Sequence, residues 1–223
     1  MRASLRGLAR HARSLALRAA FRLADPPDQP MLSVPAHHPS TPRFSAIDVH
    51  AHLRGPFALG WAKRSAAELE AFLDAGGMER IVDLNGETGQ RLDEEIARFS
   101  SLGDRVAVFT GFDYGAIGMS DQFGDVIAAD VRRAKAAGAR GIKVWKTLGL
   151  HARDRRGSLV GIDDERLDPV WLVAADADLP ILIHVADPKA FFEPLNRSNE
   201  RWEELRLHPE WQYWPPRPRG RGS

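Results

Sequence analysis

The chain has 223 residues, 43% of them hydrophobic, which is enough to bury a sizeable core in one or two domains. Its 31 basic and 30 acidic side chains leave a formal charge of +1, so no global field favours nucleic acid or an acidic membrane surface as a partner. There is no cysteine, which excludes disulfides, thiolate metal sites and a cysteine nucleophile, and fits a cytoplasmic location. Any bound metal must therefore use histidine and carboxylate.

Residues 1–42 form a segment of distinct composition. Six arginines lie among leucine, alanine and serine before the first acid, Asp25, and a proline-rich linker follows. The composition is that of a transit peptide or of a dispensable N-terminal extension, and we favour an extension that is disordered or partly helical. Its apolar core is too short and too interrupted by arginine to cross a membrane. We expect one domain over residues 43–214 and a flexible tail over residues 215–223.

Short apolar segments rich in β-branched residues alternate with segments of helical spacing from Phe44 onwards. This alternation predicts βα units and a parallel sheet covered on both faces. The predicted strands lie within residues 44–53, 79–87, 104–113, 139–149 and 179–188. The predicted helices lie within residues 65–77, 88–103, 121–138 and 163–178, with Thr88 as a candidate cap.

Two architectures fit such a pattern, an open doubly wound sheet and a (β/α)8 barrel. No G-x-G-x-x-G motif follows the first strand, so a dinucleotide-binding fold lacks support. Polar residues instead stand late in several strands, as they do at the mouth of a barrel. We predict a partial TIM (β/α)8 barrel of about five βα units, with parallel strands and outer helices. The late polar residues are His50, His52, Asp83, Asn85, Asp113, Lys143, Lys146, His184 and Asp187.

Three histidines are the candidate metal ligands. His50 and His52 point the same way because side chains alternate along a strand, and His184 stands near the exit of the fifth strand. Strands 1 and 5 face each other across an eight-stranded barrel, so the three imidazoles converge in that fold. Taken singly, each has a simpler explanation, as a surface histidine or a hydrogen-bonded core histidine.

The motifs IDVHAHL, GIKVWK and ILIHVADP, in this order, resemble the amidohydrolase superfamily, specifically the amidohydrolase-related TIM-barrel enzymes. The similarity covers about residues 44–214. It implies that His50, His52 and His184 hold one divalent metal ion, most simply Zn²⁺, and that the substrate is a small molecule. The implied reaction is hydrolysis of an amide, ester or lactone by a metal-activated water. A nonoxidative metal-dependent decarboxylase on the same barrel is the alternative.

The chain departs from that family in its second half. The aspartate at the end of the eighth strand and the histidine on the sixth have no counterpart, so the catalytic residue is unknown. A whole barrel needs about 250 residues, and we therefore expect a truncated or frame-shifted enzyme. A catalytically incompetent fragment that only binds metal is a further alternative, with self-association through unpaired barrel edges.

Four residues after or within the fourth predicted strand are candidates for substrate binding: Lys143, Trp145, His151 and Arg153. Some binuclear amidohydrolases bridge two metals with a carboxylated lysine on this strand. Lys143 is open to that role, to anchoring a substrate, or to a structural ion pair. The cationic loop over residues 147–162 fits a carboxylate substrate, or is simply a solvated loop.

Overall fold

The computed structural model describes residues 41–55, 58, 60–185 and 187–213. The predictions for residues 1–40 and 214–223 lie outside these residues. The described chain divides into an α/β unit that ends at Asp187 and a smaller segment that begins at Pro188. Within the described ranges, no helix has both the length and the apolar character needed to span a bilayer.

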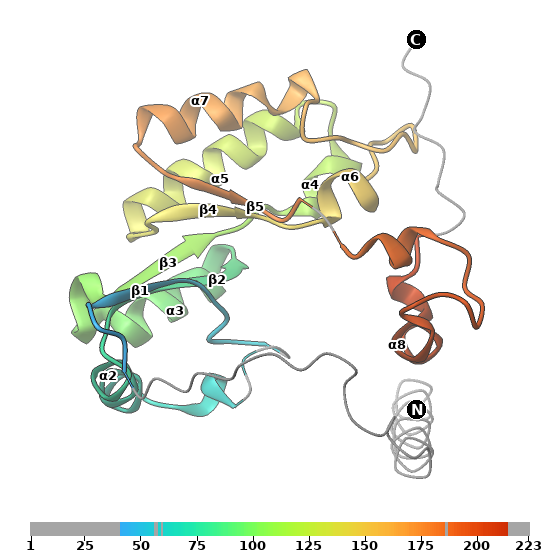
Figure 1. The fold of residues 1–223 in the computed structure, drawn as a ribbon. Helices are drawn as coiled ribbons and strands as arrows, with labels where there is room; N and C mark the ends of the chain where they lie inside the picture. Colours follow the sequence, from blue (N-terminus) through green and yellow to red (C-terminus); the bar gives the residue numbers. More distant parts are fainter. Residues whose placement is uncertain (1–40, 56–57, 59, 186, 214–223) are drawn as a thin grey trace, which may run out of the picture. The chain divides into compact units, whose positions relative to one another are not determined.

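The α/β unit is built on one parallel sheet whose five strands follow the chain order β1-β2-β3-β4-β5. The sheet curls into a half-barrel, as Figure 1 shows. The predicted parallel α/β fold is thereby confirmed, while its assignment as a TIM barrel stays a prediction. The strands are β1 (Ala46–Ala51), β2 (Met78–Glu87), β3 (Val106–Thr110), β4 (Gly141–Val144) and β5 (Ile181–Ile183).

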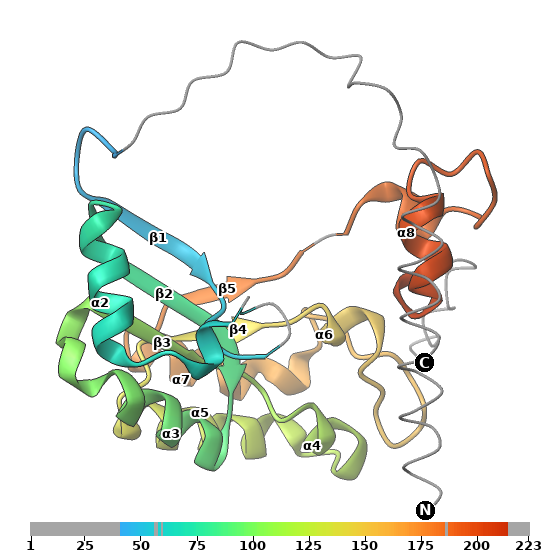
Figure 2. The ribbon, with the colours of Figure 1, turned by 90° about the horizontal axis from the view of Figure 1, so that it is seen from below.

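All four predicted helices form, and they lie along the outer face of the curled sheet (Figures 1 and 2). They are α2 (Ala66–Ala75), α3 (Gly89–Phe99), α5 (Phe123–Ala137) and α7 (Asp168–Asp176). The sequence reasoning did not anticipate the short elements α4 (Tyr114–Met119), α6 (Thr147–Leu150) and η1 (Trp61–Lys63). The short helices η2 (Ser100–Arg105) and η3 (Glu165–Leu167) overlap the segments predicted as helical over residues 88–103 and 163–178.

Local signals explain where several of these helices begin and end. Ser65 and Glu68 form a capping box at the start of α2, in which each side chain accepts a hydrogen bond from the other residue's N–H. Gly138 ends α5 with a φ of 113°, a left-handed conformation that favours glycine. Thr88 does stand at the N-cap of α3, but its side chain makes no capping hydrogen bond.

Two apolar clusters fill the space between the sheet and its helices. One joins β4 to α5 and α7, and the other joins β2 and β3 to α2 and α3. Ile142 and Val144 of β4 belong to the first cluster, so they point toward the helices. Because side chains alternate along a strand, Lys143 and Trp145 lie on the opposite, inner face of the sheet. The strand ends near these two residues position the candidate site.

The two edge strands carry exposed apolar side chains. Ile47 and Val49 on β1 are 53% and 58% exposed, and Val185 after β5 is 86% exposed. Each strand pairs on one side only within the described sheet. The self-association expected of such edges stays a prediction.

The smaller segment contains η4 (Lys189–Phe192), α8 (Trp202–Leu207) and η5 (Pro209–Trp211). Phe191 and Leu205 are buried, and the amide of Asn199 donates to the carbonyl of Ala190 at 2.8 Å. The ring of Phe192 stacks on Tyr213. These contacts hold the segment together.

Candidate metal centre

His50 and His52 lie together at the carboxyl end of β1. Their ring centroids are 5.5 Å apart, with His50 exposed and His52 partly buried. Two imidazoles bound to one tetrahedral zinc, at Zn–N distances of about 2.0–2.1 Å, have centroids about 5 Å apart. The spacing of this pair therefore fits two ligands of a single ion.

The pKa of the His52 imidazole is lowered. Burial contributes most, and the charges of His50 and Lys143 act in the same direction, whereas a hydrogen bond with the side chain of Asn85 opposes them. A lowered pKa keeps the imidazole neutral, and the neutral form is the one that binds metal ions.

His184 lies just after β5, where its backbone N–H donates to the carbonyl of Val144 at 2.9 Å. Its Nε2 is 3.6 Å from Oδ1 of Asp187. Asp187 in turn accepts two hydrogen bonds of 3.0 Å from the ammonium group of Lys146. His184 thus stands beside a carboxylate that is already paired.

Trp145 connects the two histidine positions. Its indole stacks on His52 at a centroid distance of 5.4 Å, and its centroid is 6.4 Å from that of His184. The backbone N–H of Trp145 donates to the hydroxyl of Tyr114 at 2.8 Å, which fixes the start of the loop after β4. The substrate-binding role predicted for Trp145 stays a prediction, but its place beside both histidines is compatible with it.

Lys143 is fully buried on the inner face of β4, at 0% exposure. Among the described residues its Nζ has no hydrogen-bond partner, and it lies 5.1 Å from the centroid of the Trp145 ring. Burial lowers the pKa of this amine. A buried cation without a counter-charge is costly, so this position favours an anionic group close by.

The three predicted ligands do not form one cluster. In the described parts of the chain, no three side chains of His, Cys, Asp or Glu stand close enough together to hold a metal ion. The structure brings His50 and His52 together and leaves His184 with Asp187. The pair fits a half-site, and the complete three-histidine set does not fit as placed.

Asp83 and Asn85 on β2 support the histidine pair. Oδ1 of Asp83 accepts from the backbone N–H groups of Leu53 and Asn85 at 3.1 and 3.3 Å, and its Oδ2 accepts from Nδ2 of Asn85 at 3.1 Å. Asp83 is fully buried, and burial raises its pKa to about 7. Sequence reasoning placed both residues late in a strand but gave neither a role.

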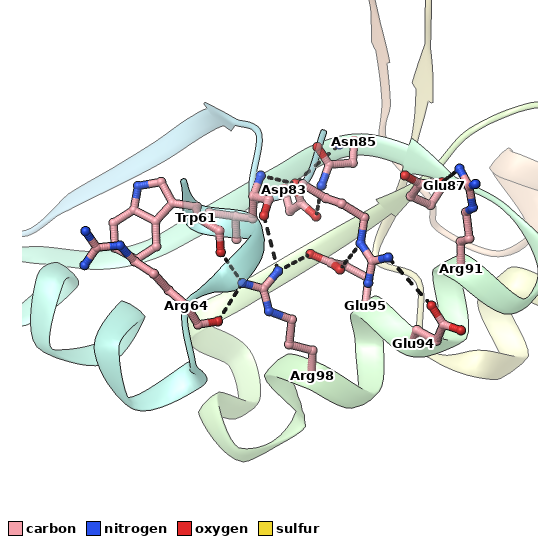
Figure 3. A network of polar contacts seen from close by, with 11 residues as sticks. Trp61, Arg64, Asp83, Asn85, Glu87, Arg91, Glu94, Glu95 and Arg98 are labelled. Carbon is pink, nitrogen blue, oxygen red and sulfur yellow. Dashed lines mark hydrogen bonds and ion pairs between the residues drawn. The ribbon is translucent and has the colours of Figure 1, made fainter. Parts of the chain in front are cut away.

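A buried ion-pair cluster holds the chain just after His52 (Figure 3). Glu95 of α3, at 0% exposure, accepts from Arg54 at 2.8 Å and from Arg98 at 3.1 Å. Arg98 also donates to the carbonyls of Leu53, at 3.2 Å, and of Trp61. Sequence reasoning missed this cluster, although Glu95 falls on the apolar face of α3 between Leu92 and Phe99, which was a usable signal.

The two other predicted substrate-binding residues lie in the loop after β4. His151 is exposed. Arg153 pairs with Leu159 in an isolated antiparallel bridge, and its guanidinium donates to the carbonyl of Gly157 at 2.7 Å. Arg153 therefore helps to close a local turn, and a role for either residue in substrate binding stays a prediction.

No protein-family model, curated protein or solved structure matches the chain. The resemblance to amidohydrolases rests on the three sequence motifs and stays a prediction.

Proposed function

We propose that this chain binds a divalent cation, Zn²⁺ first, through His50 and His52; His184, as the third ligand, would have to move from its place beside Asp187. We further propose that the reaction it serves is amidohydrolase-type hydrolysis of an amide, ester or lactone in a small molecule. The observation that carries the proposal is the 5.5 Å spacing of the two imidazoles at the carboxyl end of β1. A bound ion would polarise a carbonyl and lower the pKa of its water.

The expected substrate carries a carboxylate. Lys143 supports this, because its buried ammonium group has no hydrogen-bond partner among the described residues and lies near Trp145, which stacks on His52. A carboxylate placed there would satisfy the amine. The same feature favours a second candidate, a nonoxidative decarboxylase, because its substrate is itself a carboxylate.

A third candidate is metal binding without turnover. It needs only the His50–His52 pair, whose rings lie 5.5 Å apart. Product analysis separates the three. Hydrolysis incorporates oxygen from ¹⁸O-labelled water, decarboxylation releases carbon dioxide without such incorporation, and a binding protein does neither.

Zinc binding tests the shared premise. Calorimetry should show one zinc ion per chain for the parent, and affinity at least about 10-fold weaker for the His50→Ala/His52→Ala double variant. His208→Ala is the control, because it also removes an imidazole and the His208 ring stacks on Trp211. Equal zinc affinity in the parent and the double variant would overturn the proposal.

A further inference from the structure

Asp83 holds the backbone on both sides of His52. In the β1–β2 ladder it pairs with Ala51, the residue before His52, and its Oδ1 accepts from the N–H of Leu53, the residue after it. The carbonyl of Leu53 is held in turn by Arg98. His52 therefore sits on a backbone that is fixed at both neighbouring positions.

The direction of the Asn85 amide is set by Asp83 (Figure 3). Nδ2 of Asn85 donates to Oδ2 of Asp83, while Oδ1 of Asp83 is engaged by backbone N–H groups. At pH 8.5 the Asp83 side chain is ionised and can only accept, so the amide nitrogen must face it. The amide oxygen of Asn85 is then the atom left to accept from the His52 ring, with which Asn85 makes a side-chain hydrogen bond.

Asn85 also restrains His52 from a second direction. Its backbone carbonyl accepts from Nε1 of Trp145 at 3.3 Å, and the Trp145 indole stacks on the His52 ring with an interplanar angle of 23°. One residue thus bonds the imidazole through its side chain and holds the ring that covers it.

From these contacts we propose that Asn85 and Asp83 are positioning residues that select one tautomer of His52. The ring N–H faces the amide oxygen of Asn85, and the other ring nitrogen keeps its lone pair for a ligand. This inference deepens the proposed function and rests on it, because the nitrogen left without a proton is the one that would bind the cation.

Asp83→Asn gives a directional test. The new amide must keep its oxygen toward the two backbone donors, so its nitrogen faces Asn85. The Asn85 amide then turns over to offer its oxygen, and its nitrogen faces His52. His52 becomes the acceptor, so the opposite tautomer is favoured. Asn85→Leu removes the side-chain hydrogen bonds of Asn85 with Asp83 and with His52, so we expect a mixture of His52 tautomers.

The readout is the pair of ring ¹⁵N chemical shifts of His52, measured at pH 8.5 in metal-free, ¹⁵N-histidine-labelled protein and assigned with His52→Gln. We expect one tautomer in the parent, the opposite one in Asp83→Asn and a mixture in Asn85→Leu. Asp154→Asn, which also removes a buried carboxylate, is the control and should match the parent. The same tautomer in the parent and both variants, or a mixture in the parent, would overturn the inference.

Zinc titration separates this inference from the proposed function. If the parent binds zinc, Asp83→Asn and Asn85→Leu should bind it about 10- to 100-fold more weakly, and unchanged affinity in both variants would contradict the positioning role. If the parent binds no zinc but the tautomers change as expected, the proposed function fails and the positioning of His52 stands.

Discussion

The difference in stability between the Asp83→Asn variant and the parent should shift in favour of the variant as the pH rises. Burial, together with repulsion from Glu95, raises the pKa of Asp83 to about 7 from 3.8, against the opposing effect of the N–H groups of Leu53 and Asn85. Between pH 3.8 and about pH 7, the folded state therefore keeps a proton on Asp83 that the unfolded state has already lost. Parent stability falls as the pH rises through this window, and an asparagine cannot titrate.

The size of the effect follows from the shift. One pKa unit corresponds to 1.36 kcal/mol, so a shift of about 3 units is worth about 4 kcal/mol over the whole window. Between pH 5 and pH 8 the parent should lose about 2.5 kcal/mol of this stability. All other carboxylates are common to both proteins, so the difference between them isolates Asp83.

Urea unfolding of the parent and Asp83→Asn at pH 5, 6, 7 and 8 measures this difference. The free energy of unfolding of the variant should gain about 2.5 kcal/mol on that of the parent across the series. A difference that stays constant with pH would show that folding does not raise the pKa of Asp83. The same variant should bind zinc more weakly, and a gain in stability with a loss of affinity distinguishes a positioning role from a structural one.

Three further predictions concern stability and are also measured by urea unfolding. Glu95→Ala should lower the free energy of unfolding by about 3–5 kcal/mol, because it leaves the guanidinium groups of Arg54 and Arg98 without their buried partner. Asp93→Ala, which breaks an exposed pair with Arg133, should lower it by less than about 1 kcal/mol. Equal losses in the two variants would contradict this prediction. Gly124→Ala should lower the free energy of unfolding by about 1–3 kcal/mol, because a Cβ there would overlap the carbonyl oxygen of Arg166. Gly118→Ala should be nearly neutral, because its Cβ would lie 3.6 Å from the nearest atom, the carbonyl oxygen of Arg153. A neutral Gly124→Ala would contradict the prediction and show that the backbone can shift. Asp154→Asn should show the opposite pH dependence to Asp83→Asn. Burial tends to raise the pKa of Asp154, but hydrogen bonds from Ser158, Arg166 and Arg156 outweigh it and lower the pKa. The Asp154 carboxylate therefore stabilises the folded parent at neutral pH, and this stabilisation is lost as the pH falls.

Much of the α/β unit was predictable because its signals are local. Five β-branched segments became five parallel strands, and four periodic segments became the helices that cover them. Gly138, through its backbone conformation, and the Ser65–Glu68 box, through its side chains, mark helix ends that lie next to them in the sequence. The short helix Tyr114–Met119 was missed because it spans only six residues and has no clear periodicity.

The candidate site was predictable only in part, because it depends on contacts between distant residues. The H-x-H spacing places His50 and His52 on one side of a strand, and the structure keeps them together. The contact between Arg54 and Glu95 joins residues 41 positions apart, and no local pattern reports it. The position of His184 depends on how far the sheet curls, which strand-by-strand reasoning does not determine.

The coordination shell of the zinc-loaded protein, measured by X-ray absorption spectroscopy, shows directly whether His50 and His52 bind the ion. We predict a shell with at least two imidazole ligands in the parent, completed by further imidazole or oxygen, and a loss of two imidazoles in His50→Ala/His52→Ala. A shell made only of oxygen in the parent, or the same number of imidazoles in both proteins, would contradict it.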